Sequence, residues 1–400
     1  MNKFTALYQK AKSVCISILK KILSFFVWIL TPILILVAAL YQKVKPVCVR
    51  ILKKILSFFL WILAPVLILT SAFITNGIII FLFGYNPIEA YAAAIGITFG
   101  SVSAVSETLV RSTPFLMTGL SVAIAFRCGM WNIGAEGQFL MGVLAATWFG
   151  TKIAILFPNT SWIAVPLCLS FAILAGGIWG IIPAILKVTR GVNEVISTIM
   201  LNYIAIHFVS LMIDGGPLQE TSKTGPQSDP IAEWVFLPRL FESHRIHLGT
   251  GLAVILAIVL TYVLFRTTFG YQLRAVGEGA AAAEAAGISI SHNTLRVFFI
   301  SGALAGLGGA IEIMALVPHR LTENFSPDYG YTAIAVALLA KLHPLMTVAT
   351  ALLFGALAKG SFAMEAEVGI SRQVTLMMQA IILLFVIGAS AVKFFRKRTL

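Results

Sequence analysis

Apolar runs about as long as a membrane is thick follow one another along most of this chain. A transmembrane helix needs roughly 20 predominantly apolar residues, and from Ile55 onward such runs alternate with short polar segments. Their limits lie near 56–83, 113–130, 136–151, 162–186, 195–213, 249–266, 294–317, 329–342, 344–360 and 373–392. We therefore predict an all-α fold, a polytopic transmembrane helical bundle with about 10 spans.

A duplicated segment precedes these runs. Residues Ala6–Leu36 recur at Ala39–Leu69, an offset of 33 positions at which 24 of 31 residues are identical. Each copy is a basic stretch followed by an apolar one. If the first copy crossed the membrane alone, one basic cluster would face the wrong side under the positive-inside rule. We expect it to lie interfacially or re-entrantly at the cytoplasmic surface, and we divide the chain into this segment, 1–54, and a transmembrane domain, 55–400.

Composition supports the membrane class and excludes others. The 400 residues are 59% hydrophobic and 11% charged, whereas a soluble domain carries about 25% charge. The net charge of +13 sits in short clusters beside apolar runs, which predicts membrane orientation rather than a nucleic-acid partner. The four cysteines form no CxxC pair, so we predict no metal site and no redox motif.

Basic clusters orient the predicted bundle. If successive apolar runs cross the membrane in alternating directions, three basic clusters fall on the same side of it. These clusters are Lys187 with Arg190, Arg266 with Arg274, and the tail Phe394–Arg398. Because cytoplasmic loops carry the excess of Lys and Arg, we predict that both termini are cytoplasmic in a multi-pass cell-membrane protein. The segments predicted outside are Tyr85–Ser112, Lys152–Ser161, Asp214–His247, Pro318–Asp328 and Ser361–Arg372.

The segment Gly129–Gly142, GMWNIGAEGQFLMG, carries the most informative polar residues. Ionisable residues at membrane depth are costly and face protein or a water-filled cavity, and glycine-interrupted helices form solute sites in many transporters. The alternative is a cytoplasmic turn that caps two helices. The candidate solute-path residues here are Asn132, Gly134, Glu136, Gly137 and Gln138.

A second polar stripe lies in Gly191–His207, GVNEVISTIMLNYIAIH. Glu194, Thr198 and Asn202 are four residues apart, so they share one face of a helix. Either they contact the solute, together with Asn193, or they form hydrogen bonds between packed helices.

Small residues at the same spacing favour close packing elsewhere. Gly302, Gly306 and Ala310 form one such stripe, and Gly176 with Gly180 form another. We interpret both as sites of close helix approach. The chain contains no Walker A sequence, so a transporter of this sequence that uses ATP needs a separate subunit to bind it.

The cytoplasmic loop between Arg266 and Arg296 contains an alanine-rich stretch. Ala280–Ala286 is a strong helix former, and Gly287 suits the position that ends such a helix. A short helix of this kind is a natural docking element for a partner protein.

Three strings resemble one family. They are similar to the permease subunits of nucleoside and simple-sugar ABC importers, a branch of the ribose and branched-chain amino-acid permease superfamily. The three strings are PFLMTGLSVAIAFRCGMWNIGAEGQFLMG, GVNEVISTIMLNYIA and TTFGYQLRAVGEGAAAAEAAGIS. The resemblance covers roughly Leu69–Lys393. Two features depart from the family pattern: the duplicated N-terminus, and Gly-Glu-Gly at 277–279 where Gly-x-Asn is commoner.

The resemblance implies a mechanism and a set of site residues. It places the residues of the first polar segment on the translocation path, with Asn193, Glu194 and Asn202 in the same region. It implies a coupling loop for the ATPase formed by Arg274, Gly277, Glu284, Ala285 and Gly287.

The function that follows is a permease, not an enzyme, of an ATP-driven importer for nucleosides or related small polar solutes. It implies an ABC ATPase, a second permease subunit that is related or identical, and an extracellular or periplasmic substrate-binding protein, all in contact with membrane lipid. No cofactor is expected, because ATP is bound by the partner subunit. The alternatives are a sugar or amino-acid ABC permease, or a secondary transporter or channel that works without ATP.

Overall fold

The computed structural model of this chain describes Ser24, Leu63 and residues 66–241, 244–371, 373–382, 384–385 and 388. The chain divides into two units, Met1–Leu67 and Ile68–Leu400. The second unit holds the elements that matter for function. Apart from Ser24, the duplicated segment 1–54 and its expected surface position lie outside the described residues, as does the proposed boundary between residues 54 and 55.

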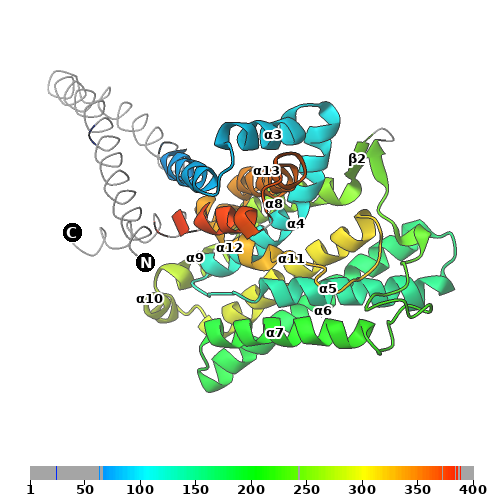
Figure 1. Cartoon of the computed structure of the whole chain (residues 1–400). Helices are drawn as coiled ribbons and strands as arrows, with labels where there is room; N and C mark the ends of the chain where they lie inside the picture. The colour runs from blue at the N-terminus through cyan, green and yellow to red at the C-terminus, as the bar shows by residue number, and fades with distance from the viewer. Residues whose placement is uncertain are drawn as a thin grey trace, which may run out of the picture. The chain divides into compact units, whose positions relative to one another are not determined.

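Seven helices in the described part of the chain are long and apolar enough to cross a membrane. They are α4 (Val102–Arg127), α5 with its short extensions (Ala135–Leu156), α6 (Ser161–Arg190), α7 (Glu194–Ile213), α8 (Leu248–Arg266), α11 (Ile290–Ala315) and α13 (Pro344–Val368). Four shorter apolar helices are Val66–Leu82, α3 (Pro87–Phe99), α12 (Tyr329–Leu339) and Gln373–Ile382. The predicted all-α, multi-span bundle is confirmed (Figure 1).

The remaining elements are short. The helix α5 proper ends at Trp148 and continues as a π-helical turn, Phe149–Ile153, and a 3-10 turn, Ala154–Leu156. Between α7 and α8 lie a 3-10 turn, Glu233–Val235, and the antiparallel hairpin of β1 (Arg239–Phe241) and β2 (His244–His247). Between α8 and α11 lie α9 (Thr268–Glu278) and α10 (Ala280–Ala285).

Polar side chains and one glycine fix several helix ends. The side chains of Ser101, Asn193 and Ser289 each accept a hydrogen bond from a backbone N–H in the first turn of α4, α7 and α11. Gly191 ends α6 with a φ of 68°, a conformation that glycine adopts without steric cost. These caps satisfy backbone groups that a helix end leaves without partners.

The centre of the bundle is α11, which packs against α4, α5 and α6 (Figure 1). A Cβ atom added to Gly176 of α6 would collide with the carbonyl oxygen of Gly302, and one added to Gly142 of α5 would collide with the backbone of Gly306. The backbones therefore touch with no side chain between them, which confirms close helix packing at both small-residue stripes; that the two stripes pack against each other is a finding of the structure.

The segment Tyr85–Ser112, which was predicted to lie outside, contains α3 and the start of α4, capped by Asn86 and Ser101. One predicted span is wrong. The predicted span 329–342 is not a full span: α12 has 11 residues and rises about 16 Å, about half of the hydrocarbon core of about 30 Å. The chain from Leu321 to Asp328 has no helix and leads directly into it.

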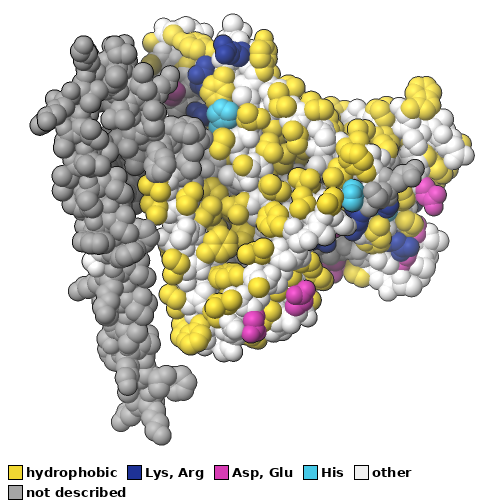
Figure 2. Space-filling model, turned by 90° about the horizontal axis from the view of Figure 1, so that it is seen from above, with side chains coloured by type: hydrophobic (Ala, Val, Ile, Leu, Met, Phe, Trp, Pro, Cys, Tyr) yellow, Lys and Arg dark blue, Asp and Glu magenta, His cyan; other side chains and the backbone are white. Residues whose placement is uncertain are grey.

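Large apolar side chains cover the outside of the helices, as expected where helices meet lipid. Leu211, Ile255 and Tyr262 are more than half exposed. Figure 2 shows hydrophobic side chains spread over the visible face, with few charged groups among them. A soluble protein rarely exposes so large a continuous apolar surface.

Candidate functional site

The polar residues predicted between α4 and α5 form one buried network. Asn132 is fully buried; its Nδ2 donates to Gln138 Oε1 at 2.9 Å and to Ser301 Oγ at 2.8 Å. Its Oδ1 accepts from the backbone N–H of Gly134 at 2.9 Å and from Gln138 Nε2 at 3.1 Å. The segment from Gly129 to Gly134 is thus held as a fixed turn that starts α5 in the bundle interior.

The polar stripe of α7 faces this turn. Asn202 Oδ1 accepts from the backbone N–H of Gly137 at 2.8 Å, and its Nδ2 donates to the carbonyl of Ile133 at 2.9 Å. A Cβ atom at Gly134 would lie 3.0 Å from the Cβ of Thr198. The glycines of the turn therefore allow α7 to approach closely, and the two predicted polar segments meet in space.

Two buried carboxyl groups hold the start of the short helix α12. The backbone N–H of Gly330 donates to Glu136 Oε2 at 2.6 Å, and the hydroxyl of Tyr329 donates to Glu312 Oε1 at 3.0 Å. Both carboxyl groups lie on long helices, α5 and α11, with residue exposures of 2% and 6%. An acidic group at a helix N-terminus is favourable, because it meets free N–H groups and the positive end of the helix dipole.

Aromatic rings surround the same point. The ring of Tyr329 packs edge-on against Phe115 at 4.9 Å between centroids and lies 5.5 Å from the ring of Phe139. The site is therefore a buried patch of amides, carboxyl groups and aromatic rings at a broken helix.

Other predicted residues lie at the edge of this patch. Asn193 caps α7 through a hydrogen bond from the backbone N–H of Val195, and Glu194 pairs with Lys187 Nζ at 2.6 Å. This ion pair joins the end of α6 to the start of α7, outside the hydrogen-bonded network. The structure thus brings Asn132, Glu136, Gln138, Thr198 and Asn202 together, and leaves Asn193 and Glu194 at the edge of this group.

Sequence reasoning missed the half of the site that α11 and α12 supply, namely Ser301, Glu312, Tyr329 and Gly330. The hydrogen bond between Asn132 and Ser301 joins residues 169 positions apart, and the one between Glu136 and Gly330 joins residues 194 positions apart. Glu312 carried a usable signal, since it is an acidic residue within an apolar span. Gly330 carried none.

The segment predicted as a cytoplasmic coupling loop forms α9 and α10. Glu284 and Ala285 are exposed, and Gly287 follows α10 with a φ of 79°. Arg274 turns inward, its guanidinium 5.4 Å from the ring centroid of Phe265. Gly277 lies against the carbonyl oxygen of Arg127, which a Cβ atom there would strike.

On the opposite side of the bundle, the segment after α7 is clamped to the chain that leads into α12. Arg320 forms an ion pair with Glu220, and the backbone N–H of Ser228 donates to the carbonyl of Leu321 at 2.8 Å. Hydrogen bonds from Thr224 and Gln227 lower the pKa of Glu220 to about 2. The carboxylate is thus ionised at physiological pH and keeps the clamp closed.

Known proteins resemble this chain over most of its length. A family described as branched-chain amino acid transport system / permease component matches residues 104–387. A guanosine ABC transporter permease of Bacillus subtilis is 38% identical over 318 residues, which cover 79% of this chain and 90% of the relative. A nucleoside ABC transporter permease of Lactococcus lactis is 32% identical, covering 80% and 88%. A glucose ABC transporter permease of Haloferax volcanii is 33% identical, covering 82% and 87%.

Proposed function

Because this chain belongs to the family of branched-chain amino acid transport system permease components, we propose that it carries nucleosides through the membrane by way of the buried polar site at α12. The chain is a multi-pass membrane protein and the permease of an ABC importer. Two of its similar relatives are named for guanosine and nucleosides. The single observation that carries the choice of solute is the 38% identity to the guanosine permease.

The chemistry of the site supports a nucleoside. Aromatic rings such as that of Tyr329 can stack on nucleobases, and each stacking interaction contributes about 1–3 kcal/mol to binding. Amide groups like those of Asn132 and Gln138 can both donate to and accept from a base edge or a ribose hydroxyl. In the present conformation these groups bond to one another, so the site opens to solute when α12 leaves Glu136. Movement of α12 away from α5 is therefore the step that would admit the solute.

Uptake measurements test the solute. Cells that express the complete transporter should take up labelled guanosine, and unlabelled nucleosides should compete while branched-chain amino acids should not. Competition by glucose alone would indicate a sugar permease, as the relative from Haloferax volcanii suggests. Uptake that persists after ATP depletion would indicate a secondary transporter or channel, and the proposal would then be wrong.

The helices α9 and α10 are the part of the permease that docks the ATPase, which binds the ATP. Their exposed face includes Glu284 and Ala285 of α10, and Gly277 of α9 lies directly against the backbone of Arg127. A partner that moves α9 therefore moves the turn before α5. Both termini lie in the cytoplasm, the substrate-binding protein meets the opposite side, and a second permease chain completes the pore.

A proline exchange tests this docking. Ala283 lies inside α10, where its N–H donates to the carbonyl of Gly279 at 2.9 Å. Proline there loses this bond and costs about 3 kcal/mol. The matched control is Ala280→Pro, because Ala280 is the first residue of α10 and proline is well tolerated there.

The Ala283→Pro variant should insert in the membrane at normal level, lose co-purification of the ATPase, and lose uptake. The Ala280→Pro variant should retain both. Normal ATPase binding and uptake in Ala283→Pro would assign docking to another surface. Loss of docking in both variants would show that the measured effect does not depend on the helix α10.

A further inference from the structure

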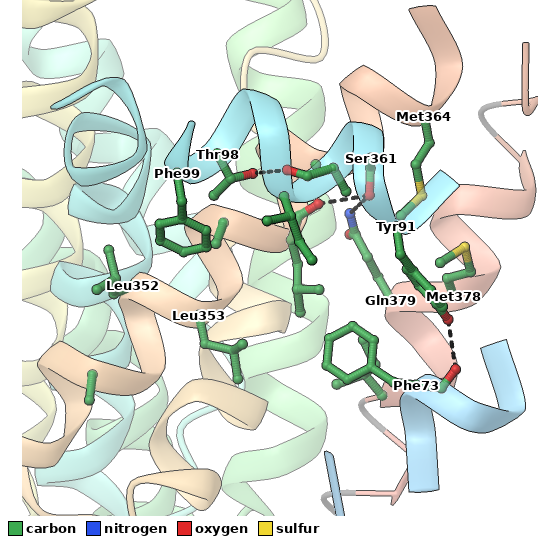
Figure 3. A pocket seen from close by; sticks show the side chains of 17 residues that line it. Phe73, Tyr91, Thr98, Phe99, Leu352, Leu353, Ser361, Met364, Met378 and Gln379 are labelled. Carbon is green, nitrogen blue, oxygen red and sulfur yellow. Dashed lines mark hydrogen bonds between the residues drawn. The ribbon is translucent and has the colours of Figure 1, made fainter. Parts of the chain in front are cut away.

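A cavity of about 570 Å³ lies among α3, α13 and the helices Val66–Leu82 and Gln373–Ile382. Its volume falls within the 300–1,000 Å³ typical of ligand-binding cavities. No residue of the polar site or of α9 and α10 lines it, so the proposed transport function leaves it unexplained. Figure 3 shows side chains from these helices converging on it, among them Phe73, Phe99, Leu353 and Met378.

The wall of the cavity is almost entirely apolar, and its four polar side chains form hydrogen bonds within the protein. Its polar side chains bond to protein: the hydroxyl of Tyr91 donates to the carbonyl of Phe73 at 2.6 Å, and that of Thr98 to its own helix at 2.5 Å. Ser361 Oγ donates to the carbonyl of Leu357 and accepts from Gln379 Nε2 at 3.2 Å. A polar solute would lose its hydration here without compensation, so the occupant is apolar.

The cavity runs along much of one long apolar helix. Its wall on α13 runs from Ala349 to Met364, within a helix that can span the membrane. Fifteen steps of an α-helix correspond to about 22 Å, which exceeds the roughly 15 Å of one leaflet of the hydrocarbon core. At the rim, Ile95 and Phe99 of α3 are 63% and 52% exposed, so the cavity is bordered by side chains that face lipid.

The volume of the cavity distinguishes between two apolar occupants, a protein helix and a hydrocarbon chain. A helix about 10 Å wide and 22 Å long fills roughly 1,700 Å³. The cavity measures about 570 Å³, and all the empty space in and around it about 1,290 Å³. A helix from a second permease chain or from another part of this chain is therefore too large to fill this space, whereas a single extended hydrocarbon chain is slender enough.

We propose that this cavity binds one acyl chain of a membrane phospholipid. The chain would lie along α13 and pack between it and α3, in contact with Phe73 and Met378. The short helix α3 has its other large apolar side chains toward lipid, so a bound tail would complete its packing against α13. This inference does not depend on which solute the permease carries.

A photo-reactive lipid tests the proposal. The complete transporter is reconstituted in vesicles of phosphatidylethanolamine and phosphatidylglycerol that contain a phosphatidylglycerol with a diazirine in its tail. After irradiation, adducts are mapped by peptide mass spectrometry. Adducts on Met364 and Met378 should saturate as the labelled lipid increases, whereas adducts at the lipid-facing Ile255 of α8 should rise in proportion to it.

Variants give a second readout. Ala356→Phe and Leu353→Trp add side-chain volume inside the cavity, and should lower adduct formation at Met364 and Met378 about tenfold, which equals about 1.4 kcal/mol. The control is Ala366→Phe, which alters an exposed residue of α13 outside the cavity. Labelling at Ile255 should not change in any variant.

Three results would overturn the proposal. One is labelling at Met364 and Met378 that rises without saturation in the unaltered protein. Another is equal labelling in the filled variants and the control. The third is a cross-link between these methionines and residues 1–54 that persists while lipid labelling is absent, which would show that protein occupies the cavity.

Discussion

Replacing Glu136 by glutamine tests whether its carboxyl group holds α12 during transport. The exchange keeps the length and volume of the side chain but removes its capacity for negative charge. Its partner is the backbone N–H of Gly330, 2.6 Å away, in a site where Glu136 is 2% exposed. The carboxyl group thus meets a backbone N–H at the start of a helix, where a negative charge is favourable.

The magnitude follows from the two kinds of hydrogen bond. A bond to a charged group contributes about 1.5–3 kcal/mol and a neutral one about 0.5–1.5 kcal/mol. Relative to the ionised carboxylate, the amide of Glu136→Gln therefore weakens the hold on α12 by about 1–1.5 kcal/mol, and part of the favourable helix-dipole interaction is lost as well. Since 1.4 kcal/mol is a factor of ten, the docked state of α12 becomes about five- to tenfold less populated relative to the released state.

The assay is initial uptake of labelled nucleoside, divided by the amount of permease in the membrane. Because each transport cycle must return α12 to its docked state, uptake by Glu136→Gln should fall about five- to tenfold, while the amount of permease and its association with the ATPase stay unchanged. The matched control is Glu365→Gln, the same exchange at an exposed residue near the end of α13. Equal uptake by Glu136→Gln and the unaltered protein would reduce the segment to a turn that caps two helices, and the reasoning would be refuted.

Three further predictions concern packing, pH and topology. Gly306→Ala should lower the melting temperature of the purified permease, because its new Cβ would lie 2.5 Å from the carbonyl oxygen of Ala172, and overpacking costs about 1–3 kcal/mol. The control Gly96→Ala should leave the melting temperature unchanged, because no atom lies within 4 Å of its new Cβ. Burial, followed by the charge of Arg245, lowers the pKa of His247 to about 4, so the unfolded form binds more protons than the folded form between about pH 6.5 and 4. The folded form should therefore lose stability as pH falls through this window. Amide exchange at the start of α8, corrected for its intrinsic pH dependence, should increase over the same window, and this increase should vanish in His247→Gln. A reporter fused after Leu400 should be active only in the cytoplasm, because the basic tail follows the last apolar run; activity outside would reverse the proposed topology.

Periodicity and composition predicted the long helices well, for a physical reason. A span such as α6 or α11 must satisfy all of its backbone hydrogen bonds internally and face lipid or other helices along its length. That requirement leaves a continuous apolar run, which can be recognised without knowledge of any neighbour. Close packing at these helices could be predicted in the same way, although not which helices pair, because Gly176 with Gly180 and Gly302 with Gly306 keep a local spacing of four.

The short helices could not be predicted in this way. The helix α12 is only half as long as a span, and its start is defined by contacts with Glu136 of α5 and Glu312 of α11 rather than by its own sequence. Apolar residues continue after its end at Leu339, so a window of hydropathy extends it. The helix α3 was missed for the converse reason, since its 13 residues are too few for a span although Asn86 and Pro87 mark its start.

The same contrast applies to the candidate site. Asn132, Glu136 and Gln138 stood out because polar residues are rare in apolar surroundings, and the spacing of four in α7 placed Thr198 and Asn202 on one face. Neither signal could reveal which segments meet, since tertiary contacts join them. Whether these residues line the solute path is a prediction that transport measurements must decide.

The contacts around Arg127 connect α9 to α12. Gly277 of α9 lies directly against the backbone of Arg127, where even a methyl group would collide. Arg127 Nε in turn donates to the carbonyl of Leu342 at 3.0 Å, in the turn that ends α12. The other end of α12 is held by Glu136, which follows Arg127 along the same turn into α5. A shift of α9 therefore acts on the segment that holds α12 at both ends, and no side chain lies between Gly277 and that segment to absorb the shift.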